Sequence, residues 1–193
     1  MTQVTKTMAK TVSVAALMVG FTSAAQAVPL ISTFVLGAGG SFAVEDGDTN
    51  GFDIQDESDG YKGFVGIEST FGVPGIQPSL GVELQYSDLG KFELNNNGGT
   101  HEADTIGLSA IAGLQLLELL RVGAKGGVHF WDSDFGPIKR DGTDFFFGLS
   151  TEIKAAPFAS IRFEWEHFYF DDDNIGFDSD LDVGSVSFVL RAF

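Results

Sequence analysis

Alternation of apolar and polar residues recurs along most of the chain and constrains its fold more than any other feature. Eight such runs cover residues 30–43, 61–71, 79–89, 103–115, 120–132, 144–155, 158–170 and 183–193. A period of two places successive side chains on opposite faces of a β-strand. The sequence therefore predicts an all-β fold of eight strands.

The segments between these runs alternate in length. The long ones are 44–60, 90–102, 133–143 and 171–182, and the short ones are 72–78, 116–119 and 156–157. Transmembrane barrels of the bacterial outer membrane have an even number of strands, short turns at one end and long loops at the other. We therefore expect residues 28–193 to form an eight-stranded antiparallel up-and-down transmembrane β-barrel.

The two faces of the expected strands differ in chemistry. In 158–170 one face carries Ile161, Phe163, Trp165 and Tyr169, and the other carries Ser160, Arg162, Glu164 and Glu166. The same division recurs in 79–87, 120–131 and 144–154. In a membrane barrel the apolar face contacts lipid and the polar face lines the lumen.

Ten ionisable residues are expected on the luminal face. They are Lys62, Glu68, Glu83, Arg121, Lys125, Glu152, Lys154, Arg162, Glu164 and Glu166, five basic and five acidic. Eight strands enclose a space that side chains can fill. Because an unpaired buried charge is very costly, we expect these groups to pair. The pairs form either a plain barrel core or a gated path for ions or small solutes.

The N-terminal segment has the features of a secretory signal peptide. Lys6 and Lys10 precede an apolar stretch from Val12 to Phe21, and Ala25 and Ala27 form an Ala-x-Ala cleavage site. We expect cleavage after residue 27, leaving a mature chain that starts at Val28. An uncleaved anchor is the alternative, although the apolar stretch is short for a membrane helix.

Charge and composition exclude some classes of partner. Removing residues 1–27 takes the formal net charge from −16 to −18, so nucleic acid is not an expected partner. There is no cysteine, so no disulfide framework can form. Asp171, Asp173, Asp178 and Asp180 could gather Ca²⁺ or Mg²⁺, but their spacing does not match an EF-hand. We expect a solvated acidic surface, with loose divalent bridging to lipopolysaccharide phosphates, and no dedicated metal or cofactor.

Several short stretches together resemble one known family. They are Tyr86–Gly90, Glu102–Thr105, Gly126–Asp132 and Ile161–Phe168 followed by Asp171–Asp173, with Phe193 at the end. In order and spacing they resemble the OmpA-like transmembrane β-barrel family. The resemblance implies a small outer-membrane barrel with a luminal cluster of Glu, Lys and Arg. The residues matching that cluster are Glu83, Lys125, Glu152 and Arg162. Glu164 and Glu166 are added because they lie on the same face of the run 158–170 as Arg162.

The chain departs from this family's pattern in two respects. Many relatives carry a peptidoglycan-binding domain after the barrel, and none follows here, so that activity is expected to be absent. In the last run, Arg191 and Phe193 share a face with Ser185, Ser187 and Val189, so the apolar face excludes the terminal Phe. Either a bulge near Arg191 switches the register, or this strand is less adapted to lipid.

Aromatic residues near the ends of the runs have their own predicted roles. In this family the C-terminal aromatic, here Phe193, resembles the signal read by the barrel-insertion machinery; a residue of the interfacial aromatic belt is the plainer interpretation. Further belt candidates are Phe34, Tyr61, Phe71, Tyr86, Phe92, Phe130, Trp165, Phe168 and Tyr169.

Catalysis is not expected, although two groups of residues contain a histidine next to possible catalytic partners. His129 with Asp132 and Ser133, or His167 with Glu166, could supply a base and its partner, but no Gly-x-Ser-x-Gly nucleophile motif is present. We expect a structural and surface-interaction protein of the outer membrane, with an extracellular receptor of unknown identity. A narrow gated channel is the first alternative, and a soluble periplasmic barrel that binds an apolar ligand is the second.

Overall fold

The computed structural model describes residues 31–49, 52–71, 76–93, 100–116, 119–135, 138–172 and 177–192. Contacts divide the chain into two compact units, Met1–Leu30 and Ile31–Phe193. The predicted signal peptide and the terminal Phe193 lie outside the described residues. The barrel described below belongs to the second unit.

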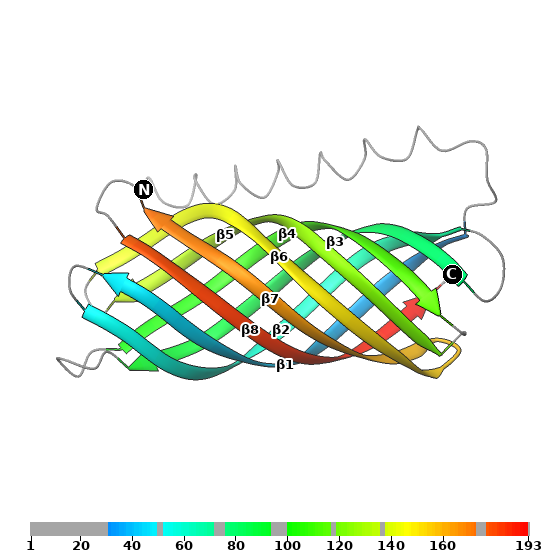
Figure 1. Ribbon diagram of the computed structural model, residues 1–193, viewed down its shortest axis with the longest axis horizontal. Helices are drawn as coiled ribbons and strands as arrows, with labels where there is room; N and C mark the ends of the chain where they lie inside the picture. Colours follow the sequence, from blue (N-terminus) through cyan, green and yellow to red (C-terminus); the bar gives the residue numbers. More distant parts are fainter. Residues whose placement is uncertain are drawn as a thin grey trace, which may run out of the picture. The chain divides into compact units, whose positions relative to one another are not determined.

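Eight antiparallel strands form one closed barrel in chain order, as Figure 1 shows. They are β1 (Ile31–Thr49), β2 (Phe52–Thr70), β3 (Ile76–Glu93), β4 (Thr100–Leu116), β5 (Leu120–Phe135), β6 (Ile138–Ala156), β7 (Ala159–Asp172) and β8 (Phe177–Ala192). The predicted eight-stranded up-and-down barrel is therefore confirmed. In the described part of the chain, no helix is long and apolar enough to cross a membrane.

The strands extend well beyond the alternating runs. The β1–β2 ladder continues to the pair Thr49↔Phe52, and β5–β6 continues to Phe135↔Ile138. Much of the predicted long loops 44–60, 133–143 and 171–182 is therefore strand. The hydrophobic alternation ends before the strands do, because backbone pairing does not need an apolar face.

Closure between β1 and β8 is regular, from Phe34↔Ala192 to Asp48↔Asp178. Of the two alternatives for the last run, the bulge near Arg191 is therefore wrong. The register shifts found along the described ladders lie between Asp88 and Lys91 and between Lys154 and Ala156. At the first, Gly90 has a φ of 84°, and a Cβ there would lie 2.1 Å from Ser58 Oγ. Only glycine fits this irregularity without strain.

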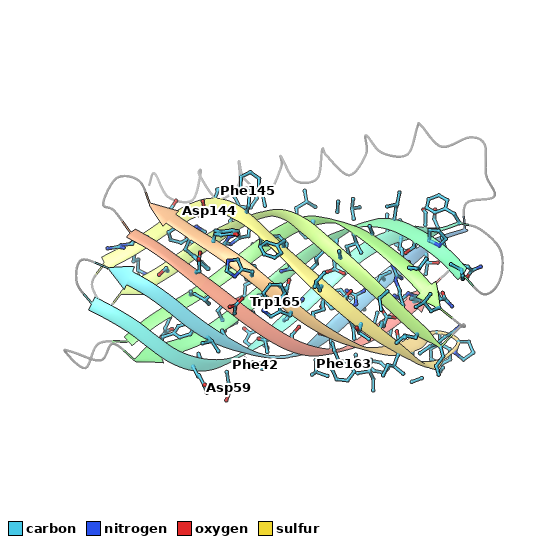
Figure 2. All side chains as sticks on the ribbon, in the orientation of Figure 1. Phe42, Asp59, Asp144, Phe145, Phe163 and Trp165 are labelled. Atoms are coloured by element: carbon cyan, nitrogen blue, oxygen red, sulfur yellow. The ribbon has the colours of Figure 1, made fainter. Side chains whose placement is uncertain are left out.

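The two faces of the wall differ as the alternation predicts. The outward aromatics Phe163 and Trp165, labelled in Figure 2, are exposed, whereas Arg162 and Glu164, which alternate with them along β7, are buried. Two belt candidates are corrected, because Phe92 and Phe168 are completely buried in the interior. Phe168 has the parity of Arg162 and Glu164, so it points inward on a regular strand.

Candidate functional site

The centre of the barrel holds a group of buried ion pairs, here called the upper cluster: Lys62, Glu83, Gln85, Lys125, Glu164 and Glu166. The Lys62 ammonium on β2 lies 2.7 Å from Glu164 and 2.6 Å from Glu166 on β7. Lys125 on β5 reaches the same two carboxylates at 3.0 and 2.7 Å. Two lysines from different walls thus neutralise two neighbouring glutamates and tie three strands together.

Gln85 completes the hydrogen bonding of this cluster. Its amide nitrogen donates to Glu166 at 3.0 Å, and its carbonyl oxygen accepts from Lys125 at 2.8 Å. Lys125 also lies 3.5 Å from Glu83. Gln85 is absent from the expected luminal set because that set contains only ionisable residues. Its position two residues after Glu83, on the same face of the strand, was the signal that could have identified it.

A second group, the lower cluster, lies toward the ends of the strands that the short turns join: Glu68, Ser79, Arg121, Glu152, Ser160 and Arg191. Arg191 forms a bidentate pair with Glu152 and lies 3.7 Å from Glu68. Glu68 also pairs with Arg121, whose guanidinium donates to Ser79 Oγ at 2.7 Å.

Arg162 on β7 joins the two clusters. Its Nη1 donates to Glu83 at 2.7 Å, and its Nε lies 3.3 Å from Glu152. The guanidinium also covers the ring of Phe64 at 4.4 Å. Glu83, Lys125, Glu152, Arg162, Glu164 and Glu166 are thus brought into one connected network by the fold.

The balance of five cations and five carboxylates is kept, but one expected member is wrong. Lys154 is exposed and lies two residues before the end of β6. Arg191 takes its place and forms the buried pair with Glu152. Its shared parity with the buried Ser187 and Val189 was the signal that could have identified it.

Toward the strand ends away from the short turns, the interior holds a large apolar cluster. It consists of Ala43, Leu89, Phe92, Ala103, Trp131, Phe146, Phe168, Phe170, Leu181 and Val183. On one wall Trp131, Phe146, Phe168 and Phe170 form what we call the aromatic plug. Phe146 and Phe168 are stacked with ring centroids 5.1 Å apart, and Trp131 meets Phe170 edge-on at 5.4 Å.

Glycine makes room for two of these rings. A Cβ at Gly142 would lie 2.3 Å from the Trp131 ring, and one at Gly107 would lie 3.1 Å from Phe146. The large rings therefore lie over positions without side chains, as close packing in a narrow tube requires. Trp131 also donates from Nε1 to Asp144 at 2.6 Å, which satisfies its polar atom.

His129 is embedded in the plug. Its Nε2 lies 2.8 Å from the Tyr169 carbonyl oxygen, and its ring meets Phe168 and Phe170 edge-on at 5.1 Å. Asp132 projects from the opposite face of the same strand and is exposed. His167 faces outward beside Asp182 at 3.0 Å, whereas Glu166 faces inward. Neither considered catalytic pairing is assembled.

Outside the barrel, carboxylates border the aromatic band. Phe42 is paired with Asp59, and Tyr61 with Asp88, across neighbouring strands; Phe42 and Asp59 are labelled in Figure 2. From Asp88 a row continues through Asp104, Asp132 and Asp141 on β3 to β6, all of outward parity. Among the described residues, no group of three or more acidic or histidine side chains is placed to hold a metal ion.

Two exposed ion pairs lie beyond this border. Lys91 pairs with Glu102 at 2.5 Å and Lys139 with Asp134 at 2.9 Å. The hydrogen bond and the negative charge of Glu102 raise the pKa of Lys91, and Asp134 does the same for Lys139. Because all four side chains are hydrated, these pairs contribute little to stability.

Comparison with known proteins gives one family and several structures of the same fold. The family model described as outer membrane protein beta-barrel domain matches residues 13–190. The structure resembles the attachment invasion locus protein Ail of Yersinia pestis, in complex with the heparin analogue sucrose octasulfate. The identity is 12%, with 83% of this chain and 99% of Ail covered, and the TM-score is 0.56. It also resembles Neisserial surface protein A, with 13% identity, 81% and 96% coverage and a TM-score of 0.51. Sequence comparison with curated proteins gives no match.

Proposed function

We propose that this chain, which belongs to the outer membrane protein β-barrel domain family, is a structural barrel whose extracellular surface binds its partners. The single observation that supports this role is the filled interior. Ion pairs occupy its centre, and ten buried apolar residues occupy its extracellular half. An interior filled in this way leaves the outer surface as the place for recognition.

The charge of that surface indicates the class of partner. Acidic residues dominate the strand ends beyond the aromatic band, and the row Asp88, Asp104, Asp132 and Asp141 crosses four neighbouring strands. Ail was crystallised with a polysulfated ligand. A surface this acidic repels polyanions, so we propose that this protein binds a cationic partner, such as a lysine-rich segment of an extracellular protein.

Binding to reconstituted barrels tests this proposal directly. Proteoliposomes of uncharged lipid would be exposed to a fluorescent polylysine peptide and, separately, to sucrose octasulfate. We expect salt-sensitive binding of the peptide alone, and weaker binding after Asp132→Asn and Asp141→Asn substitutions. Binding of sucrose octasulfate, or peptide binding unaffected by salt, would refute the proposed class of partner.

Export and assembly complete the proposal. Residues 1–27 direct secretion and are cleaved, Phe193 is read by the barrel-insertion machinery, and the mature barrel sits among lipid and lipopolysaccharide. The outward apolar surface supports the membrane location over a soluble periplasmic barrel, since Phe145 is 71% exposed and Leu149 58%. Heating outer membranes in detergent tests it: a compact fast gel band that slows on boiling supports a closed membrane barrel.

A narrow channel remains the second candidate, and one observation favours it. Several buried hydroxyls that face the interior, among them those of Ser87, Ser109 and Ser187, have no hydrogen-bond partner among the described residues. Such groups usually bond to water, so they could mark a hydrated path. Conductance of the reconstituted protein in planar bilayers separates this candidate from a closed scaffold.

A further inference from the structure

The interior is accessible to different degrees at its two ends. In the lower cluster the side chains of Arg121 and Arg191 are 13% and 18% exposed. In the upper cluster Lys62 and Glu166 are 1% and 0% exposed, and in the plug Phe168 is completely buried. Accessibility therefore falls from the short-turn end, which faces the periplasm in this architecture, toward the plug.

The two fillings oppose the passage of an ion by different means. The clusters offer charged and polar partners at every level, and an ion entering them could exchange with an existing pair. The plug presents mainly ring and aliphatic carbon around the imidazole of His129, and its one bonded carboxylate, Asp144, is held at its edge by Trp131. Moving a charge into such surroundings without compensation is very costly, and hydrophobic constrictions block flow by excluding water.

We propose that the aromatic plug is the permeability barrier of this barrel, and that the ion-pair clusters below it form a blind, hydrated pit open only to the periplasm. Two of the unpartnered hydroxyls lie below the plug: Ser109 is paired in register with Glu83, and Ser187 with Arg162, at the level of the clusters. The unpartnered hydroxyl of Thr105 lies beside the plug, since Thr105 is paired with Trp131. Breaking ion pairs therefore enlarges the pit without opening it.

Phe168 is the position at which the barrier can be tested. Its ring is stacked on Phe146 and touches His129, so Phe168→Ala removes the centre of the plug. The matched control is Phe163→Ala, which removes the same ring from the outer face of the same strand. Arg162→Ala breaks the ion pairs and leaves the plug intact.

Planar-bilayer recordings of the full-length mature barrel distinguish the two barriers. We expect a gain of resolvable channel openings in Phe168→Ala and wild-type behaviour in both Phe163→Ala and Arg162→Ala. Each variant is first checked for the heat-dependent gel shift, so that only closed barrels are compared. Openings in Arg162→Ala, or a silent Phe168→Ala that still shows the shift, would overturn the proposal.

A thiol at the same position gives a second measurement. The chain has no cysteine, so Phe168→Cys introduces the only thiol. We expect this variant to conduct and to be blocked by a bulky, membrane-impermeant maleimide added from the long-loop side. Current that persists after complete labelling would show that ions bypass the plug. The inference rests on the membrane location proposed above. If that location is wrong, the barrels show no heat-dependent gel shift. If only the role of the plug is wrong, the variants insert into the membrane and show the shift but do not conduct.

Discussion

The two halves of the barrel interior solve the same packing problem with different chemistry. The half toward the short turns and the centre are filled by directional, paired charges, and the opposite half is filled mainly by stacked rings and aliphatic side chains. Both fill the lumen between antiparallel strands of the same closed barrel. A charged network tolerates no missing partner, because each group left behind is a buried charge, whereas an apolar cluster loses only contact area when one member shrinks.

The largest effect is expected where a charge is left unpaired. Arg162→Ala leaves Glu83 with only the 3.5 Å contact to Lys125, and it removes one partner of Glu152. Breaking one partner of a buried pair typically costs about 3–5 kcal/mol. The free energy of unfolding in urea and detergent micelles, followed by the gel shift, measures the loss.

The double variant Arg162→Ala with Glu83→Ala sharpens this prediction. If the cost arises from an unpaired carboxylate, removing that carboxylate restores part of the stability lost by Arg162→Ala. If the loss of unfolding free energy in the double variant equals the sum of the losses in the two single variants, the two residues do not interact energetically. That result would weaken the contrast between the two halves of the interior.

Overpacking is the next largest expected effect, in the apolar half. Gly142→Ala places a methyl group 2.3 Å from the Trp131 ring, which has to move together with its hydrogen bond to Asp144. Such additions to a packed core cost about 1–3 kcal/mol. Gly126→Ala is the matched control, because its Cβ would lie on the outer face with its nearest neighbour 3.8 Å away. Equal losses of unfolding free energy in both variants would show that the change in strand flexibility, and not the contact with Trp131, is the cause.

Much of this division could be predicted from parity alone. The period of two correctly placed Trp165 outside and Glu166 inside, because neighbouring residues on a regular strand face opposite ways. It failed for Lys154, whose inward parity does not bury it at the end of β6. Phe168 shares the parity of Glu164 and Glu166, which places it inside; its assignment to the belt was wrong because a long aromatic residue suits both lipid and a packed lumen.

The axial order of the interior could not be predicted. Which charges meet depends on the stagger between strands, and Lys62 reaches Glu164 across 102 positions of sequence. Nor did the alternation show that β1 and β2 continue to Thr49 and Phe52, because the regular alternation of apolar and polar residues stops before these strand ends. Barrel closure fixes that stagger, and no local pattern records it.

A modest effect is expected for a conservative change in the plug. Phe168→Leu replaces the aromatic ring with a smaller, branched apolar side chain. Apolar swaps that nearly keep the volume usually cost less than about 1.5 kcal/mol. The same unfolding measurement applies. A loss as large as that of Arg162→Ala would show that the plug depends on ring geometry as strictly as the clusters depend on pairing.

The smallest effect is expected for the exposed pair of Lys91 and Glu102, whose side chains are 68% and 50% exposed. Glu102 raises the pKa of Lys91, so any contribution of the pair to stability is complete below the pKa of an unfolded lysine, about 10.4, and is lost as the pH rises through the folded value. Lys91→Ala should therefore leave the unfolding free energy unchanged within error at neutral pH, and the pH profile should differ from wild type only above that range. A clear loss at neutral pH would mean that the polar strand ends stabilise the barrel, and that pairing matters outside the lumen as well as inside it.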